Sequence, residues 1–222
     1  MSRQPRVWLA VLLASLWLGG CATTEPTGVQ RLQARASYES GLAHLRDKQP
    51  ALALNAIQEA IALDGTVAVY RNALGLLYLE LRRPDLALDE FRKATEIDPH
   101  YAEAHLNTGI ALAETSRWEE AVVAYRRAIA MPTLAVPHVA YQNLGLALYH
   151  LKQYRDAEQA LKFALSLEPQ MEAAYYNLGL VFVAEGRKDE AKAAFRRVRD
   201  LAPQSPFGQA AVGQLRALGE GG

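Results

Sequence analysis

Cys21 is the residue of this chain whose type and position point most directly to covalent chemistry. It is the only cysteine among 222 residues, so no disulfide within the chain explains it. Two arginines, an unbroken apolar or small run over residues 7–18 and a pair of glycines precede it in that order. This order is typical of a secretory signal peptide, over residues 1–20, that ends in small residues. The mature chain would then begin at this cysteine.

A transmembrane helix and an ordinary secretory signal are the alternative interpretations of this segment. The apolar run has 12 residues, which span about 18 Å as a helix, whereas a bilayer core needs about 30 Å. An ordinary signal needs no cysteine at the cut. The sequence LGGC at residues 18–21 resembles the lipobox of bacterial lipoproteins. The resemblance implies cleavage before Cys21 and acylation of its thiol, and this covalent lipid is the only cofactor expected.

The anchor also sets the expected location of the protein. Ala22 follows the cysteine, at the place where an aspartate would resemble the inner-membrane retention signal. The resemblance therefore implies a lipid anchor in the outer membrane, with the body on its periplasmic face. Residues 21–33 are polar after the cysteine and include a proline and a glycine, which predicts a lipidated tether that averages roughly 20 Å as a flexible coil.

No other residues are arranged for catalysis or metal binding. None of the five histidines has another histidine four residues away, so no helical zinc face is expected. Acidic pairs such as Glu119–Glu120 open second helices, where they favour the helix dipole. The Gly-basic stretch at residues 186–188 is interpreted as a turn with solvated charges, and no phosphate-binding loop is present. We expect no enzyme, no metal and no small-molecule substrate.

The balance of charge argues against nucleic-acid binding. The chain has 24 Lys and Arg against 24 Asp and Glu, and loss of the signal peptide leaves a net charge of −2. A nucleic-acid binder would normally show a basic excess.

A repeat of about 34 residues fills the rest of the chain. Glycines recur at intervals of 34, 34, 36 and 34, each followed at fixed spacing by an alanine, a large apolar residue and then a second alanine, which is replaced by valine in the last repeat. The glycines are Gly41, Gly75, Gly109, Gly145 and Gly179, and the large residues are Ile57, Phe91, Tyr125, Leu161 and Phe195. The pattern resembles the tetratricopeptide repeat, which is a pair of helices of about 14 residues each. We expect each glycine to face the alanines of its partner helix.

The predicted fold is all-α: a tetratricopeptide-repeat superhelix, or α-solenoid, of five clear repeats plus a C-terminal capping helix. The expected units are 34–67, 68–101, 102–137, 138–171 and 172–205, within a domain over 34–205, and residues 206–222 form the capping helix and tail. A solenoid needs such a cap over its last apolar face. The third unit is two residues longer, with two prolines in its last turn. This turn is either a neutral variation in loop length or a feature characteristic of one protein family.

The first helices of such repeats line a concave groove, where a partner would bind. Repeat positions place these candidates in it: Tyr38, Leu42, Asn72, Leu76, Leu79, Leu106, Asn107, Ile110, Asn143, Leu146, Tyr149, Asn177 and Leu180. The leucines could accept apolar side chains while the asparagines clamp a peptide backbone. Alternatively, the leucines pack between helices and the asparagines only maintain the repeat. Because groove lysines and arginines are scarce, we expect an apolar or amphipathic partner segment.

The lipobox, the short tether and the repeats together resemble the type IV pilus pilotin lipoproteins. The long turn and the helix after it (residues 131–161) are similar to a proline-containing detour in that family, although six repeats rather than five are typical there. The resemblance implies a protein that helps the pilus secretin reach the outer membrane and assemble. The alternative is a general periplasmic adaptor that scaffolds peptidoglycan enzymes or another envelope complex. Either way, the partner is an envelope protein and the anchor holds the chain at the membrane.

Overall fold

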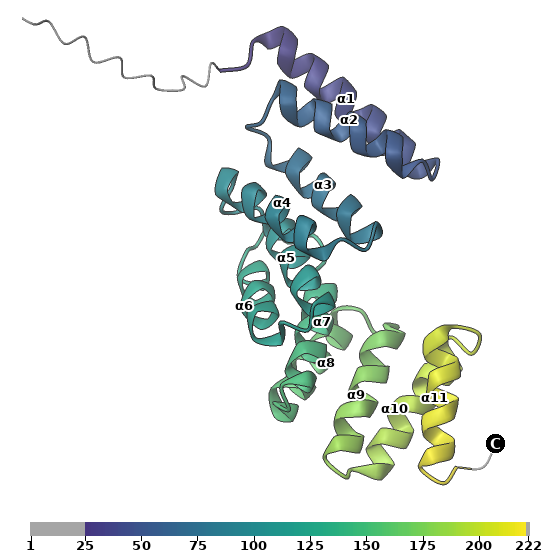
Figure 1. The fold of residues 1–222 in the computed structure, drawn as a ribbon. Coiled ribbons are helices and arrows are strands. Elements are labelled where there is room, and N and C mark those ends of the chain that lie inside the picture. Colours follow the sequence, from purple (N-terminus) through teal and green to yellow (C-terminus); the bar gives the residue numbers. More distant parts are fainter. Residues whose placement is uncertain (1–24, 221–222) are drawn as a thin grey trace, which may run out of the picture.

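Eleven helices and no strand make up the residues that the computed structural model describes, 25–220 (Figure 1). The helices are α1 (Gly28–Arg46), α2 (Pro50–Leu63), α3 (Ala68–Glu80), α4 (Pro84–Ile97), α5 (Ala102–Glu114), α6 (Trp118–Ile129), α7 (Pro137–His150), α8 (Tyr154–Leu167), α9 (Glu172–Ala184), α10 (Lys188–Leu201) and α11 (Pro206–Ala217). They form five antiparallel pairs that stack in chain order, with α11 against the last pair. The predicted solenoid is therefore confirmed.

The first helices of the pairs lie on the inner side of the stack. Each of α3, α5 and α7 contacts the next first helix, and α9 contacts α11. Consecutive second helices within residues 25–220 share no comparable contact. Because one row of helices is closer together than the other, the stack curves and the first helices line its concave face.

Helix α1 begins six residues earlier than the repeat pattern predicted. Thr27 forms a capping box with Gln30: the Gln30 amide donates to the Thr27 hydroxyl at 3.3 Å, and the Thr27 amide donates to the Gln30 side chain at 2.8 Å. These bonds satisfy backbone donors that would otherwise be exposed at the helix start. Residues 28–33 are therefore helical rather than part of a flexible tether. Cys21 and the expected signal peptide lie outside the described residues.

The repeat glycines allow close packing within each pair, but their partner is not the one predicted. A Cβ atom on Gly41 would lie 2.7 Å from Cγ1 of Ile57, and one on Gly145 would lie 2.5 Å from Cγ of Leu161. Each glycine thus faces the large apolar residue of the second helix, rather than chiefly the alanines on either side of it. The alanines are buried too, and their small side chains let the same two helices approach closely.

The long turn between α6 and α7 is packed onto the body of the protein. Leu134 is buried in the main core, and the Ala135 amide donates to Glu103 of α5 at 3.3 Å. The extra residues therefore fill part of the core between the third and fourth repeats. No helix within residues 25–220 is both long and apolar enough to cross a membrane.

Candidate functional site: the concave groove

The groove presents a row of apolar side chains along the first helices. Leu76 on α3 is 43% exposed, and Leu42 on α1 is also exposed. The other predicted groove residues that remain partly accessible are Tyr38, Leu79, Ile110, Asn143, Leu146, Tyr149 and Leu180. Together these exposed and half-buried side chains, which are distributed over the five first helices, form an extended and largely apolar surface that a partner segment could cover.

Four predicted contact residues are buried, which corrects their assignment to the partner surface. Leu106 is 3% exposed, and Asn72, Asn107 and Asn177 are also buried. The Asn107 side chain donates to the Asn72 side-chain oxygen at 2.9 Å, across two repeats. An amide pair of this kind satisfies polar groups inside the protein. The alternative interpretation, in which these residues hold the repeats together, therefore applies to them.

A cavity of about 450 Å³ opens where α5, α6 and α7 meet. Its lining residues are Ile110, Ala113, Glu114, Trp118, Tyr125, Asn143 and Leu146. Ile110, Asn143 and Leu146 were predicted to line the groove. Trp118 and Tyr125 were missed because they belong to the second helix of the third repeat, although the sequence holds a signal at Tyr125. Tyr125 is the one hydroxyl-bearing residue at a position that is otherwise isoleucine, leucine or phenylalanine.

The polar groups of this cavity have few partners in the protein. Tyr125 is 2% exposed, and burial, with a smaller effect of the Glu114 charge, raises the pKa of its hydroxyl. Nothing in residues 25–220 forms a hydrogen bond with that hydroxyl or an ion pair with Glu114. Trp118 stacks on His150 with ring centroids 3.9 Å apart and planes 6° from parallel. Partial burial lowers the pKa of His150, which favours a neutral imidazole there.

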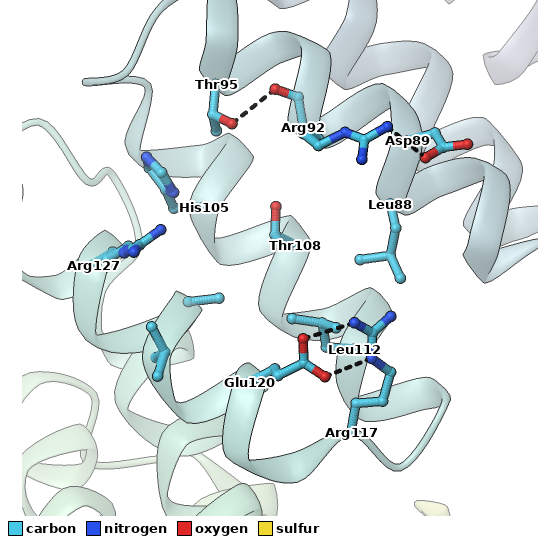
Figure 2. A pocket seen from close by; sticks show the side chains of 12 residues that line it. Leu88, Asp89, Arg92, Thr95, His105, Thr108, Leu112, Arg117, Glu120 and Arg127 are labelled. Carbon is cyan, nitrogen blue, oxygen red and sulfur yellow. Dashed lines mark hydrogen bonds and ion pairs between the residues drawn. The ribbon is translucent and has the colours of Figure 1, made fainter.

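A second hollow of about 450 Å³, between α4, α5 and α6, differs from this cavity in its polar groups (Figure 2). Arg117 binds Glu120 through two contacts of 2.7 Å, and Arg92 donates to Asp89 at 3.1 Å. The Thr108 hydroxyl donates to its own helix at 2.7 Å. Most of its polar groups are thus already paired, so we take the concave cavity as the stronger candidate for binding.

The described part of the chain holds no group of three or more His, Cys, Asp or Glu side chains placed for a metal ion. Its polar residues instead connect repeats, and Arg187 is an example that corrects the sequence interpretation. Instead of being a solvated charge in a turn, its guanidinium contacts Glu158, Glu185 and Glu190 at 2.6–2.7 Å.

Solved structures with the same architecture include two pilus proteins. The crystal structure of PilW, a widely conserved type IV pilus biogenesis factor, aligns with a TM-score of 0.70 at 22% identity, over 83% of this chain and 92% of that one. The structure of PilF from Pseudomonas aeruginosa aligns with a TM-score of 0.69 at 22% identity, over 87% of this chain and 95% of that one. At this identity the likeness shows the fold alone.

Sequence relatives match the repeats. Protein O-mannosyl-transferase Tmtc1 of Drosophila melanogaster is 35% identical over 94 residues, which are 40% of this chain but only 11% of that protein. A likeness to so small a part of the relative carries no activity with it. The family model described as Tetratricopeptide repeat matches residues 72–134 and 143–206, more than half of the chain. The chain therefore belongs to the tetratricopeptide repeat family.

Proposed function

We propose that this chain is an outer-membrane lipoprotein whose concave groove binds a segment of another envelope protein, and that this partner is a subunit of the type IV pilus secretin. The observation that carries the proposal is the row of accessible apolar side chains from Leu42 on α1 to Leu180 on α9. The likeness of the fold to PilW and PilF supports the choice of partner. The lipobox resemblance at Cys21 supports the location.

The physical role would be that of a pilotin. A secretin subunit crosses the periplasm with apolar, membrane-destined segments exposed, and burial of such a segment in an apolar groove removes it from water. Acylation of Cys21 would deliver the bound subunit to the outer membrane. In this proposal the chain has no catalytic role, and it binds no cofactor other than the lipid, no nucleic acid and no small-molecule substrate.

Deletion of the chain in its native host tests the pilus role. We expect heat- and detergent-resistant secretin multimers to disappear from outer-membrane fractions while secretin monomer persists. A Cys21→Ser variant is expected to leave the outer membrane and to rescue multimers poorly. Normal multimers after deletion would overturn the pilus role and leave an adaptor for another envelope complex, such as peptidoglycan enzymes, as the better assignment.

Charged substitutions in the groove test how the partner is bound. We expect a Leu42→Asp/Leu76→Asp variant to lose secretin multimers in the host while its circular dichroism spectrum stays that of the native protein, because both side chains are already exposed. Val123→Asp is the matched control: Val123 is 51% exposed, but it lines the hollow between α4, α5 and α6. Loss of multimers in the control alone would place the binding surface outside the groove.

A further inference from the structure

We propose that the cavity between α5, α6 and α7 receives a lysine or arginine side chain of the partner segment, whose apolar neighbours lie along the groove. This inference rests on the proposed function, because it names the chemistry of the segment that the groove binds. The walls of the cavity are built for the stem of such a side chain. Ile110, Ala113 and Leu146 supply apolar contacts, and long basic side chains bury their methylene groups against surfaces of this kind while the charged end stays hydrated or paired.

Glu114 supplies the opposite charge at the end of that stem. The nearest basic residue along the chain, Arg117, is bound through two nitrogens to Glu120. Glu114 is exposed and forms no ion pair within residues 25–220. It is also the last residue of α5, where the helix dipole disfavours a carboxylate and favours a cation. A cation from a partner would pair with the Glu114 carboxylate and would also interact favourably with the C-terminal end of the α5 dipole.

A similar carboxylate lies one repeat earlier along the groove. Glu80 ends α3 as Glu114 ends α5, and it too has no ion pair within residues 25–220. Arg82 and Arg83 follow Glu80 in the next turn, whereas the one basic residue in the turn after Glu114, Arg117, is bound to Glu120, so Glu114 is the carboxylate better placed to receive a cation.

Tyr125 adds a polar group that the fold itself does not need. Its hydroxyl has no hydrogen-bond partner within the described residues, and it is not a fully buried atom, so a group that enters the cavity can reach it. The second and fifth repeats place Phe91 and Phe195 against their glycines at the same position, so packing alone would be met by phenylalanine. An ammonium or guanidinium group can donate to this hydroxyl and to the Asn143 side-chain oxygen.

Trp118 gives the cavity an aromatic wall that favours a cation further. His150 covers one face of the indole ring, and the stack holds the ring in place. Cations bind favourably near tryptophan rings within about 6 Å of the ring centre. Partial burial lowers the pKa of His150, which disfavours a positive charge beside the indole ring.

The test is a selection of random twelve-residue peptides displayed on phage, made on the purified full-length chain in detergent micelles. Parallel selections use Glu114→Gln, the control Glu119→Gln and the groove variant Leu42→Asp/Leu76→Asp. Glu119 is exposed on α6 and lies outside the cavity lining, so its substitution makes the same change of charge nearby. A thermal melt of Glu114→Gln is the control for folding, and we expect the melting temperature of this variant to equal or exceed that of the wild type.

We expect the wild type and Glu119→Gln to enrich peptides with one fixed Lys or Arg among apolar residues, and Glu114→Gln to lose that preference. Fluorescence anisotropy with a selected peptide should give about tenfold weaker binding to Glu114→Gln and to Tyr125→Phe. Replacing the basic residue of the peptide by methionine should weaken wild-type binding equally, without a further loss in the variants.

Two results would overturn these assignments, and they are distinguishable. Enriched peptides without a fixed basic position, or with one that Glu114→Gln leaves unchanged, would refute the cavity inference and leave the groove proposal intact. Failure of the wild type to enrich any peptide above the Leu42→Asp/Leu76→Asp variant would refute the binding groove, and the cavity inference with it.

Discussion

Single charged residues connect neighbouring repeats in this protein, and Arg187 does so most extensively. It lies at the turn between α9 and α10 and contacts Glu158 of α8 at 2.7 Å, together with two acidic residues of its own repeat. Its guanidinium also lies over the Phe182 ring, 4.2 Å from the centroid. Because Glu158 is only 15% exposed, this contact is screened less than an ordinary surface ion pair.

The Glu158 carboxylate makes the stability of this junction depend on pH. Hydrogen bonding from Arg187, aided by Lys162, lowers the pKa of Glu158 from 4.5 to about 2. Its contribution is therefore complete above about pH 4.5 and is lost as the pH falls toward 2. We expect Glu158→Gln to reduce stability by about 1–3 kcal/mol at pH 7, and the difference from wild type to shrink at pH 3, in thermal melts followed by circular dichroism. A difference that stays constant between pH 7 and pH 3 would contradict this.

At the scale of the helix pair, the fold depends on one glycine facing one large apolar side chain. The contact recurs in all five repeats, with Ile57, Phe91, Tyr125, Leu161 and Phe195 as the large partners. All five are nearly or fully buried. Because the first helix has no side chain at this point, the large residue fills the space between the two helices and sets how closely they approach.

Adding one methyl group at such a glycine should be destabilising. Gly145→Ala would place a Cβ 2.5 Å from Leu161 and 3.3 Å from the Ala157 carbonyl oxygen, so the helices must shift, at a cost of about 1–3 kcal/mol. Gly213→Ala is the matched control. Gly213 lies within α11 with no atom within 4 Å of the added Cβ, so alanine there should stabilise by about 0.5–1 kcal/mol. Equal effects of the two substitutions in urea unfolding would contradict the packing argument.

At the scale of the whole molecule, the core is shared between repeats. One continuous cluster of buried residues runs from α5 through α11, with Ala102 and Leu215 near its ends. The first two repeats contribute smaller clusters. Each repeat therefore buries much of its apolar surface only against its neighbours.

The ability of isolated segments to fold should follow from how the core is divided between the large cluster of α5–α11 and the smaller clusters of the first two repeats. We expect residues 34–67 alone to be unfolded by circular dichroism, since a single pair cannot bury enough apolar surface to offset its ordering entropy. Residues 102–220, which contain the continuous cluster, should retain helical content and melt in a cooperative transition. A cooperative thermal transition of residues 34–67 would refute the first expectation, and a featureless melt of residues 102–220 the second.

The sequence by itself determined the helical pairs and the row of accessible apolar residues along the first helices. Small and large residues recur at fixed spacing because each pair repeats the same local packing, so Leu42 and Leu76 could be placed in the groove from their repeat positions alone. Pro50 and Pro84 are the first residues of α2 and α4, and these helix starts also follow from the sequence because proline is favoured in the first turn of a helix.

Only the tertiary structure decided which groove residues a partner can reach. Asn72 and Asn107 lie 35 residues apart and bind each other, so their burial depends on how adjacent repeats stack. The start of α1 was decided by the capping box at Thr27, which outweighed the local signals of the nearby proline and glycine. The cavity combines Glu114, Tyr125 and Asn143 from three helices. A repeat pattern describes each helix relative to its own repeat, whereas burial and charge depend on what the neighbouring repeats bring alongside it.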